Sequence, residues 1–576
     1  MKSIIQTIVL SIGIIACCTM CRWPGLPPGD PDNGGLFLPE GFEAMVVVDS
    51  VPGAARHIAV NSNGDVYVRL RFISDEGGNA ALRDMNGDGK MDSIKIWADY
   101  TDKGQYGTEM RIHNGYLWYS SVTHVYRQKL TPGKLIPESP MELMLTDTQP
   151  PRSHDTKPIA FDKKGNMYIP FGAPSDCCQV SEGAPFSPGR YPCPLLETRG
   201  GIWKFDASKP DQFQRDGEIF ATGFRSIVAI AWNNADDNLY TIMHGRDYLH
   251  WNWPMYYTEL EGAILPSEEF FRVKKGDNAG WPYTYWDHIK NRKMQAPEYG
   301  GNGKTEAKDT TYIKPVVGFP GHFAPNDLLF YSGDQFPSRY NNGAFFAFHG
   351  STSSAPYPQS GYIVAFVPFR DGNPSGPWEV FADGFSGVDT IYNTSDAKYR
   401  PMGLSEGPDG SLYVSESEKG KMWRIMFKGD REKFGTHALA AMDKRKAEAP
   451  NIKMPDEIKD NLDRKDYSPA AITYNTYCGK CHERNGEGNS RFPPLKGSEW
   501  LAGDVKQPLY IVLNGVEVEM MVRGRKFMNT MPGFANVLSD EQLADVLTYV
   551  KTEFNDAKSG VSVQEVRKAR KELYKQ

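Results

Sequence analysis

Two cysteines followed by a histidine near the carboxyl end are the most constraining feature of this 576-residue chain. The segment Cys478-Gly-Lys-Cys481-His482 has the spacing in which two thiols add to the vinyl groups of a haem and the histidine binds its iron. A redox dithiol or half of a zinc site is the alternative, but no second cysteine pair lies nearby. We therefore predict one covalently attached haem c, with Cys478 and Cys481 as its attachment points and His482 as an axial ligand.

The second axial ligand is expected to be a methionine, which raises the reduction potential and closes the iron to oxygen chemistry. Met531, followed by Pro-Gly-Phe, is the candidate. Met520, Met521 and Met528 are also near, and methionine is often only core filler. Residues 539–554 begin with an N-cap serine and an acidic turn and then place apolar residues at helical spacing. We predict an all-α class I cytochrome c domain over residues 467–556, followed by a C-terminal tail at 557–576.

The amino-terminal residues have the form of an export signal. A lysine precedes an apolar stretch that is too short to span a bilayer permanently. It ends in Ile14-Ile15-Ala16-Cys17, which resembles a bacterial lipoprotein box. We predict a signal peptide at 1–16, lipidation at Cys17, and an exported protein that is tethered to a membrane in the periplasm or at the cell surface. A plain secretory signal that is cut near Ala16 is the alternative.

Composition separates this chain from several classes of protein. Its 65 basic and 71 acidic residues give a net charge of -6, without a basic field that would recruit nucleic acid. The length favours more than one domain. The 56 glycines, 41 prolines and 12% aromatic residues favour many short strands joined by turns. Residues 17–35, rich in Pro, Gly and Asp, are expected to be a flexible spacer.

A polar turn followed by a short aromatic or aliphatic strand recurs six times, beginning near residues 61, 111, 161, 233, 339 and 407. Four-stranded sheets that are arranged radially cover one another's faces and leave only short edges. We therefore predict an all-β six-bladed propeller over residues 36–427, with unrelated hairpins of a β-sandwich as the alternative. Residues 428–466 are charged and lack strand alternation, so they are expected to link the two domains.

Three cysteines lie within the predicted propeller, at Cys177, Cys178 and Cys193. In an oxidising compartment two of them could pair, with Cys193 as the common partner. Which of the two adjacent cysteines it would meet is left open by the sequence.

One loop spaces oxygen ligands as an EF-hand does, with Asp84, Asn86, Asp88, Lys90 and Asp92 at alternate positions. The twelfth position is Lys95, so the usual bidentate glutamate is missing and a lower affinity is expected. We predict calcium at this loop, and an Asx-rich surface turn is the alternative.

Six segments of the β region carry a further signal, namely SHDTKPIAFDKKGNMYIPFG, ATGFRSIVAIAW, HGRDYL, DNAGWPYTYWDH, FFAFHGSTSSAPYPQSGYIVAFVPF and AKYRPMGLSEGPDGSLYVSE. Together these segments resemble the PQQ-dependent soluble glucose and sorbosone dehydrogenase family. The resemblance covers most of residues 36–427. It implies a six-bladed propeller that binds pyrroloquinoline quinone (PQQ), and many relatives carry a fused cytochrome.

The resemblance implies roles for particular residues. His154 looks like the general base that takes a hydroxyl proton, and Arg225 like the residue that stabilises negative charge at the reactive carbonyl. The residues that would bind the quinone are Arg56, Arg225, Ser226, Lys398 and Arg400, the last two at alternate positions of one expected strand. Backbone carbonyls of Gly245 and Arg246 would help to hold a calcium ion. His322 and His349 match family segments and either brace the cavity or act on substrate.

The chain departs from the family at three of these positions. Ser226 stands where the family usually has asparagine, and Lys398 keeps a charge but not the bidentate fork of an arginine. Ala173 stands where some members have an aspartate that orients the histidine, and Asp176 is the nearest substitute.

The resemblance and the haem motif together predict a dehydrogenase that oxidises an aldose, polyol or related sugar aldehyde at PQQ. Its electrons would pass through haem c to a downstream cytochrome or terminal oxidase. A tethered haem would supply a high local concentration of electron acceptor. The alternative is a propeller that has lost its quinone and serves as a docking module for an electron-transfer cytochrome.

Overall fold

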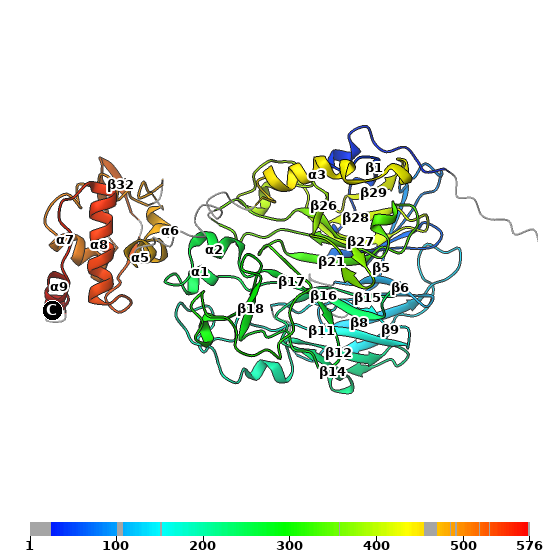
Figure 1. The fold of residues 1–576 in the computed structure, drawn as a ribbon, viewed down its shortest axis with the longest axis horizontal. Coiled ribbons are helices and arrows are strands. Elements are labelled where there is room, and N and C mark those ends of the chain that lie inside the picture. The colour runs from blue at the N-terminus through cyan, green and yellow to red at the C-terminus, as the bar shows by residue number, and fades with distance from the viewer. Residues whose placement is uncertain are drawn as a thin grey trace, which may run out of the picture.

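The computed structural model describes residues 25–100, 108–149, 153–355, 357–453, 469–483, 485–489, 492–517, 519–528 and 530–573. Figure 1 shows a large β domain and a smaller helical domain, which contains the carboxyl end. The predicted signal peptide and Cys17 lie outside the described residues.

Five four-stranded antiparallel sheets and one five-stranded sheet form the six blades of the β domain, which confirms the predicted six-bladed propeller. The first strands of neighbouring blades pack against one another around the central axis. From the innermost strand outward, the first three blades are β2 (Ala55–Val60), β3 (Val66–Ser74), β4 (Gly77–Arg83) and β5 (Ser93–Trp97); β6 (Met110–His113), β7 (Tyr116–Ser120), β8 (His124–Lys129) and β9 (Glu142–Thr146), extended by β13 (Gln212–Phe213); and β10 (Ala160–Phe161), β11 (Asn166–Phe171), β12 (Gly201–Asp206) and β14 (Glu218–Thr222).

The other three blades are β15 (Ile227–Asn233), β16 (Asn238–Met243), β17 (Glu268–Val273) and β20 (Val317–Phe319); β21 (Pro325–Phe330), β22 (Ala344–Phe348), β23 (Ile363–Val367) and β26 (Glu379–Ala382); and β27 (Pro401–Glu406), β28 (Leu412–Glu416), β29 (Met422–Phe427) and β1 (Phe42–Val48). Each of the six recurring turns joins the first and second strands of one blade. The periodicity in the sequence therefore marks the same hairpin six times.

The last blade is closed by the first strand of the chain. β1 pairs with β29, with Phe42 opposite Phe427. The ring of Phe42 meets the rings of Phe336, Phe381 and Phe427 at centroid distances of 4.9–5.0 Å. Both ends of the propeller are thus held in one sheet around a shared aromatic core.

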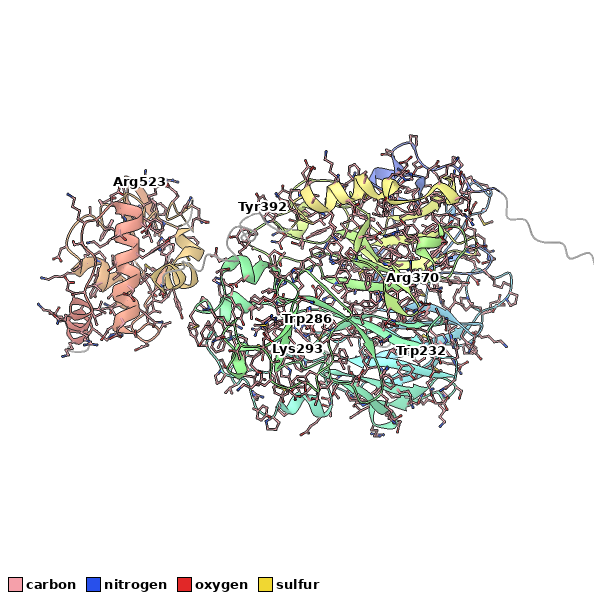
Figure 2. The ribbon with its side chains drawn as sticks, in the orientation of Figure 1. Trp232, Trp286, Lys293, Arg370, Tyr392 and Arg523 are labelled. Carbon is pink, nitrogen blue, oxygen red and sulfur yellow. A yellow bond between two sulfur atoms is a disulfide. The ribbon has the colours of Figure 1, made fainter. Side chains whose placement is uncertain are left out.

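Long loops on the propeller carry their own short elements. The two hairpins are β18 (Thr284–Asp287) with β19 (Arg292–Gln295), and β24 (Phe369–Arg370) with β25 (Asn373–Pro374). Trp286 and Lys293 are opposite each other in the first of these (Figure 2). Two short helices, α1 (Leu249–Asn252) and α2 (Glu259–Ile264), lie in the loop between β16 and β17.

The structure changes the predicted domain boundaries. The spacer is shorter than predicted, because Asp30 already hydrogen-bonds to β1, through its amide to the Ala44 carbonyl at 2.8 Å and through its carboxylate to the Val46 amide at 2.8 Å. The first part of the predicted linker belongs to the propeller, since α3 (Thr436–Glu448) buries Ala438, Leu439 and Met442. The apolar residues of this short helix are too few to reveal a helical pattern in the sequence among its many charged residues.

The carboxyl-terminal domain contains α5 (Pro469–Tyr477), α6 (Gly479–His482), α7 (Lys506–Asn514), α8 (Asp540–Asn555) and α9 (Val563–Leu573), together with two small ladders, β30 (Gly515–Val516) with β33 (Met531–Pro532) and β31 (Met520–Val522) with β32 (Arg525–Phe527). The prediction that the domain ends at residue 556 and is followed by a tail is wrong. Val566 of α9 is fully buried in the domain core, and Arg570 donates to Asp540 at the start of α8 at 2.7 Å. Helix α9 is therefore part of the haem domain.

Within the part of the chain that the structure describes, no helix is both long and apolar enough to cross a membrane.

Candidate functional site

The candidate residues gather on one face of the propeller. Each innermost strand runs from this face to the opposite one, so the residues just before each of these strands lie together. They include Arg56 at the start of β2, His154 before β10, Arg225 before β15, His322 before β21 and Arg400 before β27. The loops β11–β12, β16–β17, β22–β23 and β28–β29 reach the same face, which we call the site face.

His154 is held by a backbone carbonyl. Its Nδ1 lies 2.6 Å from the Ala173 carbonyl, which can only accept, so Nδ1 carries the proton and Nε2 keeps a lone pair. Burial, and then the positive charge of Arg225, lower the pKa of His154 to about 4. The imidazole is therefore neutral at physiological pH, as a general base must be.

Ala173 also holds Arg225, because its amide donates to the Arg225 carbonyl at 2.8 Å. One backbone unit thus fixes both residues that the sequence predicts to be catalytic. Gly172 allows this contact, since a Cβ there would lie 2.0 Å from the His154 carbonyl oxygen. The sequence suggests that Asp176 replaces the aspartate that orients the histidine in some family members. The structure shows instead that the Ala173 carbonyl orients His154.

Arg225 is buried and surrounded by acceptors. Its Nε donates to Asp176 at 2.8 Å, one terminal nitrogen donates to the Gly245 carbonyl at 2.8 Å, and the other contacts Asp176 and lies 3.1 Å from Asp247. Burial alone would lower the pKa of Arg225, but the two carboxylates outweigh burial and raise it. The neighbouring Ser226 is buried, and its carbonyl accepts from the His244 amide at 3.0 Å.

Asp247 extends this cluster to a second histidine. Nδ1 of His322 lies 3.4 Å from the Asp247 carboxylate, while its Nε2 lies 2.9 Å from the Gly262 carbonyl. Burial disfavours a charge on His322, but Asp247 outweighs this effect and raises the pKa of the imidazole. No sequence motif marks Asp247 as a site residue, although it directly follows the predicted Gly245-Arg246 pair.

A second set of cations lies on the site face near the first and last blades. Arg400 donates to the carbonyls of His349 and Gly350 at 3.1 and 2.6 Å. Arg400 and Arg71 share one carboxylate, that of Glu418, at 3.7 and 3.0 Å. Burial, and then Arg400, Arg56 and Arg71 in that order, hold the pKa of His349 well below its ordinary value. The positive charges of these three arginines therefore all act on this histidine, and Arg400 contacts its backbone directly.

Lys398 does not join this set. The expected strand is wrong, because Lys398 and Arg400 lie in the loop before β27 rather than at alternate positions of a strand. Lys398 is exposed and its Nζ lies 5.3 Å from the centre of the Tyr399 ring.

The two predicted calcium positions lie apart from each other. The Gly245 carbonyl already accepts from Arg225, and Arg246 is buried in an ion pair with Glu298 at 2.5 Å. The loop from Asp84 to Asp92 joins β4 and β5, on the opposite face from His154. In that loop Asp84 accepts from the amides of Asn86, Gly87 and Gly89, and the Asp88 and Asp92 carboxylates accept from the amides of Lys90 and Met85.

Among the described residues, no group of three or more His, Cys, Asp or Glu side chains is arranged to hold a metal ion.

The haem motif opens onto an apolar cavity in the carboxyl-terminal domain. His482 is buried, and its Nδ1 donates to the Pro493 carbonyl at 2.8 Å, which leaves Nε2 to bind a metal. Cys478 and His482 line the cavity with side chains from five segments, which include Pro493, Leu495, Trp500, Leu501, Ile511, Val512, Met520, Met531, Phe534, Leu538, Leu547 and Val550. Both cysteines of the motif are free thiols in the structure, so the residues present fit a covalently attached haem.

The structure narrows the choice of methionine ligand. Met531 and Met520 line the cavity, whereas Met521 and Met528 are 50% and 73% exposed. Met531 lies in β33, which pairs with β30 at the end of α7. The prediction of Met531 remains consistent with this position, and Met520 is the one competitor at the cavity.

The disulfide left open by the sequence joins Cys178 to Cys193. Cys177 is buried and remains a free thiol. Burial raises the pKa of this thiol, which makes it a weak nucleophile.

The fold and these two sites define a class of protein, in which a six-bladed propeller is joined to a small haem-binding domain. The TrAA12-like family matches residues 36–428, and the chain therefore belongs to the TrAA12-like family. The cbb3-type cytochrome c oxidase subunit III family matches residues 465–550.

Solved structures share the propeller fold. A carbohydrate-active enzyme of family AA12 from Trichoderma reesei superposes with a TM-score of 0.54 at 18% identity, over 68% of this chain and 97% of that one. The PQQ domain of a pyranose dehydrogenase from Coprinopsis cinerea superposes with a TM-score of 0.53 at 20% identity, over the same shares of the two chains.

Curated relatives match the chain in part. A cytochrome c-552 of Thermus thermophilus is 38% identical over 86 residues, which are 14% of this chain and 65% of that protein. A Borreliella burgdorferi protein is 27% identical over 212 residues, 36% of this chain. The chain spans about half of that protein, 49%, and less than two thirds of the cytochrome.

Proposed function

We propose that this protein is a PQQ-dependent dehydrogenase that oxidises an aldose, polyol or related sugar aldehyde and passes the electrons to its own haem c. One observation carries the proposal: a neutral, oriented histidine and a buried arginine are fixed by the same backbone unit, Ala173, on the site face. The family membership and the structural similarity to a PQQ domain support the choice of cofactor.

The charges of the site face fit a carboxylated quinone. Arg71 and Arg400 share a single carboxylate, and the positive charges of Arg56, Arg71 and Arg400 all lower the pKa of His349. This set has more positive than negative charge, which suits a ligand that carries several carboxylates. Arg56 and Arg400 would hold such a ligand, with Arg225 and Ser226 on the opposite side of the site, and Lys398 would contribute charge from the rim.

When bound, the quinone would accept two electrons and the haem would carry them away one at a time. The residues of the chain handle the proton and the charge. Nε2 of His154 would accept the proton of the substrate hydroxyl, because Nδ1 is already committed to Ala173. The Arg225 guanidinium would stabilise negative charge as it develops. His322, bound to Asp247, would keep the acceptors around Arg225 in place.

In the carboxyl-terminal domain Cys478 and Cys481 would attach the haem, and His482 and Met531 would bind its iron. The electrons would then go to a downstream cytochrome or terminal oxidase. We also propose export to the periplasm or cell surface, with a lipid anchor at Cys17.

Calcium belongs to the proposal at two positions. One uses the carbonyls of Gly245 and Arg246 near the quinone. The other is the EF-hand-like loop with Asp84, Asn86, Asp88, Lys90 and Asp92. This loop lies on the face opposite the site face, so an ion bound there would stabilise the fold and take no part in the reaction. The neighbour from Trichoderma reesei was solved with calcium, which supports a calcium test without locating the ion in this chain.

One observation favours the alternative of a quinone-free docking module. All three side-chain nitrogens of Arg225 already contact Asp176, Asp247 or the Gly245 carbonyl. A ligand would have to replace or share these contacts. A protein whose arginine is permanently neutralised in this way would bind no quinone.

The haem absorption spectrum tests the two functions. The purified protein, reconstituted with PQQ and calcium, is mixed anaerobically with a panel of aldoses, polyols and sugar aldehydes. Reduced-haem bands are expected with PQQ and absent without it. His154→Ala should abolish them, whereas His437→Ala, at an exposed position of α3, should leave them unchanged. If PQQ fails to bind in equilibrium dialysis, the docking-module function is the correct one.

A further inference from the structure

The chain leaves the propeller on the site face. Asn451, near the end of the described part of the propeller, donates to the Gly361 carbonyl at 3.0 Å and accepts from the Gly361 amide at 3.0 Å. Gly361 belongs to the loop between β22 and β23, which lies on the site face. The segment that leads to the haem domain therefore starts beside the candidate site and not on the opposite face.

The same loop connects this exit to an apolar surface. The Ser354 hydroxyl donates to the Ala263 carbonyl of α2 at 3.1 Å, and Tyr357 packs against the buried cluster that contains Leu249 of α1 and Leu260 of α2. Next to these buried residues, Tyr248, Trp251, Met255 and Tyr256 are 39–58% exposed. Figure 1 shows α1 and α2 together at one edge of the propeller. We call these four residues the aromatic patch.

The haem domain exposes three large apolar side chains on elements that line its cavity. The hairpin of β31 and β32 contributes Met520 and Val522 to the haem cavity, and its outer side exposes Met521 and, just after β32, Met528. Helix α7 repeats this arrangement, because Ile511 and Val512 line the cavity while Tyr510 is 58% exposed. Arg523 marks the turn of the hairpin in Figure 2. We call Tyr510, Met521 and Met528 the cavity lip.

We infer that the cavity lip docks on the aromatic patch of the same chain. Exposed aromatic and methionine side chains are typical of surfaces that become buried in a complex. Residues 454–468 separate the two described parts, and a segment of this length reaches at most about 50 Å. The haem domain is thus confined near the site face, at a high effective concentration for a contact that would be weak between separate molecules.

This inference deepens the proposed function, because it names the surface through which electrons would leave the propeller. The hairpin and the helix that form the lip also line the cavity that would hold the haem. Docking there would shorten the path from the site face to the haem without any part of the lip entering the catalytic site.

Disulfide trapping tests the contact without relying on activity. Tyr256→Cys and Met528→Cys are combined in the full-length protein, which is oxidised mildly, and the linked peptides are quantified by mass spectrometry. The matched control pairs Met528→Cys with Met85→Cys, which is 66% exposed in the loop on the opposite face. We expect an intramolecular 256–528 link at several times the yield of the 85–528 link. Equal yields, or links found only between two molecules, would overturn the inference.

Kinetics add a second measurement on the holoprotein. Met528→Glu should slow haem reduction by substrate several-fold, while oxidation of the same substrate by a small dye that takes electrons directly from the quinone stays unchanged. Tyr256→Lys should restore part of the lost rate in the Glu variant by placing an opposite charge at the contact. If the unmodified protein shows neither haem reduction nor dye reduction, the proposed dehydrogenase function is wrong. If Met528→Glu reduces its haem at the normal rate, only the docking contact is wrong.

Discussion

His154 determines how the reaction should depend on pH. Its pKa is lowered from 6.5 to about 4, and only the neutral form can accept a proton. The kcat/KM of dye-coupled sugar oxidation should therefore stay level from neutral pH to about pH 5 and fall as the pH approaches 4. Arg225→Gln should move this acidic limb to higher pH, because the arginine helps to lower the pKa. A limb near pH 6.5 in the unmodified protein would contradict the role of His154.

Gly172 controls the approach of two loops at the site. A methyl group at this position would lie 2.0 Å from the His154 carbonyl oxygen, so Gly172→Ala must displace the histidine. We expect a loss of about 1–3 kcal/mol in the free energy of unfolding, and a large decrease in kcat. Chemical denaturation and dye-coupled assays measure both effects. Gly25→Ala, with no atom within 4 Å of the added methyl, is the control and should change neither.

Met531 and Met520 can be separated by spectroscopy. If Met531 binds the iron, Met531→Ala should abolish the absorption band of methionine-ligated ferric haem and lower the reduction potential. Met520→Ala should keep the band, with a small effect on the stability of the domain. The reverse result would assign Met520 as the ligand.

At the residue scale, the sequence constrains the haem site more tightly than the propeller site. The haem motif is local, since its thiols and histidine lie within five consecutive residues. Residues of the propeller site come from loops far apart in the chain, and some of their contacts use backbone atoms. The substitution to Ala173 suggested a missing partner for His154, but a carbonyl, which every residue has, supplies the hydrogen bond.

At the scale of the element, β1 closes the circle of six propeller blades by pairing with β29, and this role can be tested. Phe42 is 5% exposed and packs against rings from β26, from β29 and from the loop between β21 and β22. Phe42→Ala should lower the unfolding free energy of the propeller by about 3–5 kcal/mol, because the cavity weakens the one strand that joins the two ends. Phe72→Ala, at a position that is 43% exposed, should cost far less. Tryptophan fluorescence during denaturant unfolding reports the difference, and the haem domain should unfold independently.

The sequence predicted the number and type of the blades because each contains the same short hairpin. It misjudged elements that are stabilised mainly by long-range packing. Helices α3 and α9 are rich in charged residues, and only a few of their side chains are buried, such as Met442 and Val566. Such a pattern is also typical of exposed segments, so the difference lies in partners that are distant in the sequence.

For the whole molecule, the covalent connection between the domains should determine the rate of haem reduction. Cleavage within residues 454–468 should convert a concentration-independent rate into one that rises with the concentration of the separated haem domain. Stopped-flow spectroscopy on intact and cleaved protein measures the change. An unchanged rate at micromolar concentration would show that the tether makes no contribution. Intact protein treated with inactivated protease is the control.

The pairing of β1 with β29 also has a consequence for how the molecule is made. The outer strand of the last blade is synthesised first, and it must wait for almost the whole propeller sequence before its partner exists. Contacts between such distant residues form slowly. Until then the unpaired edge of β1 is open to other strands, so a chaperone that covers the amino-terminal segment during biogenesis would protect the molecule from aggregation when it is most exposed to it.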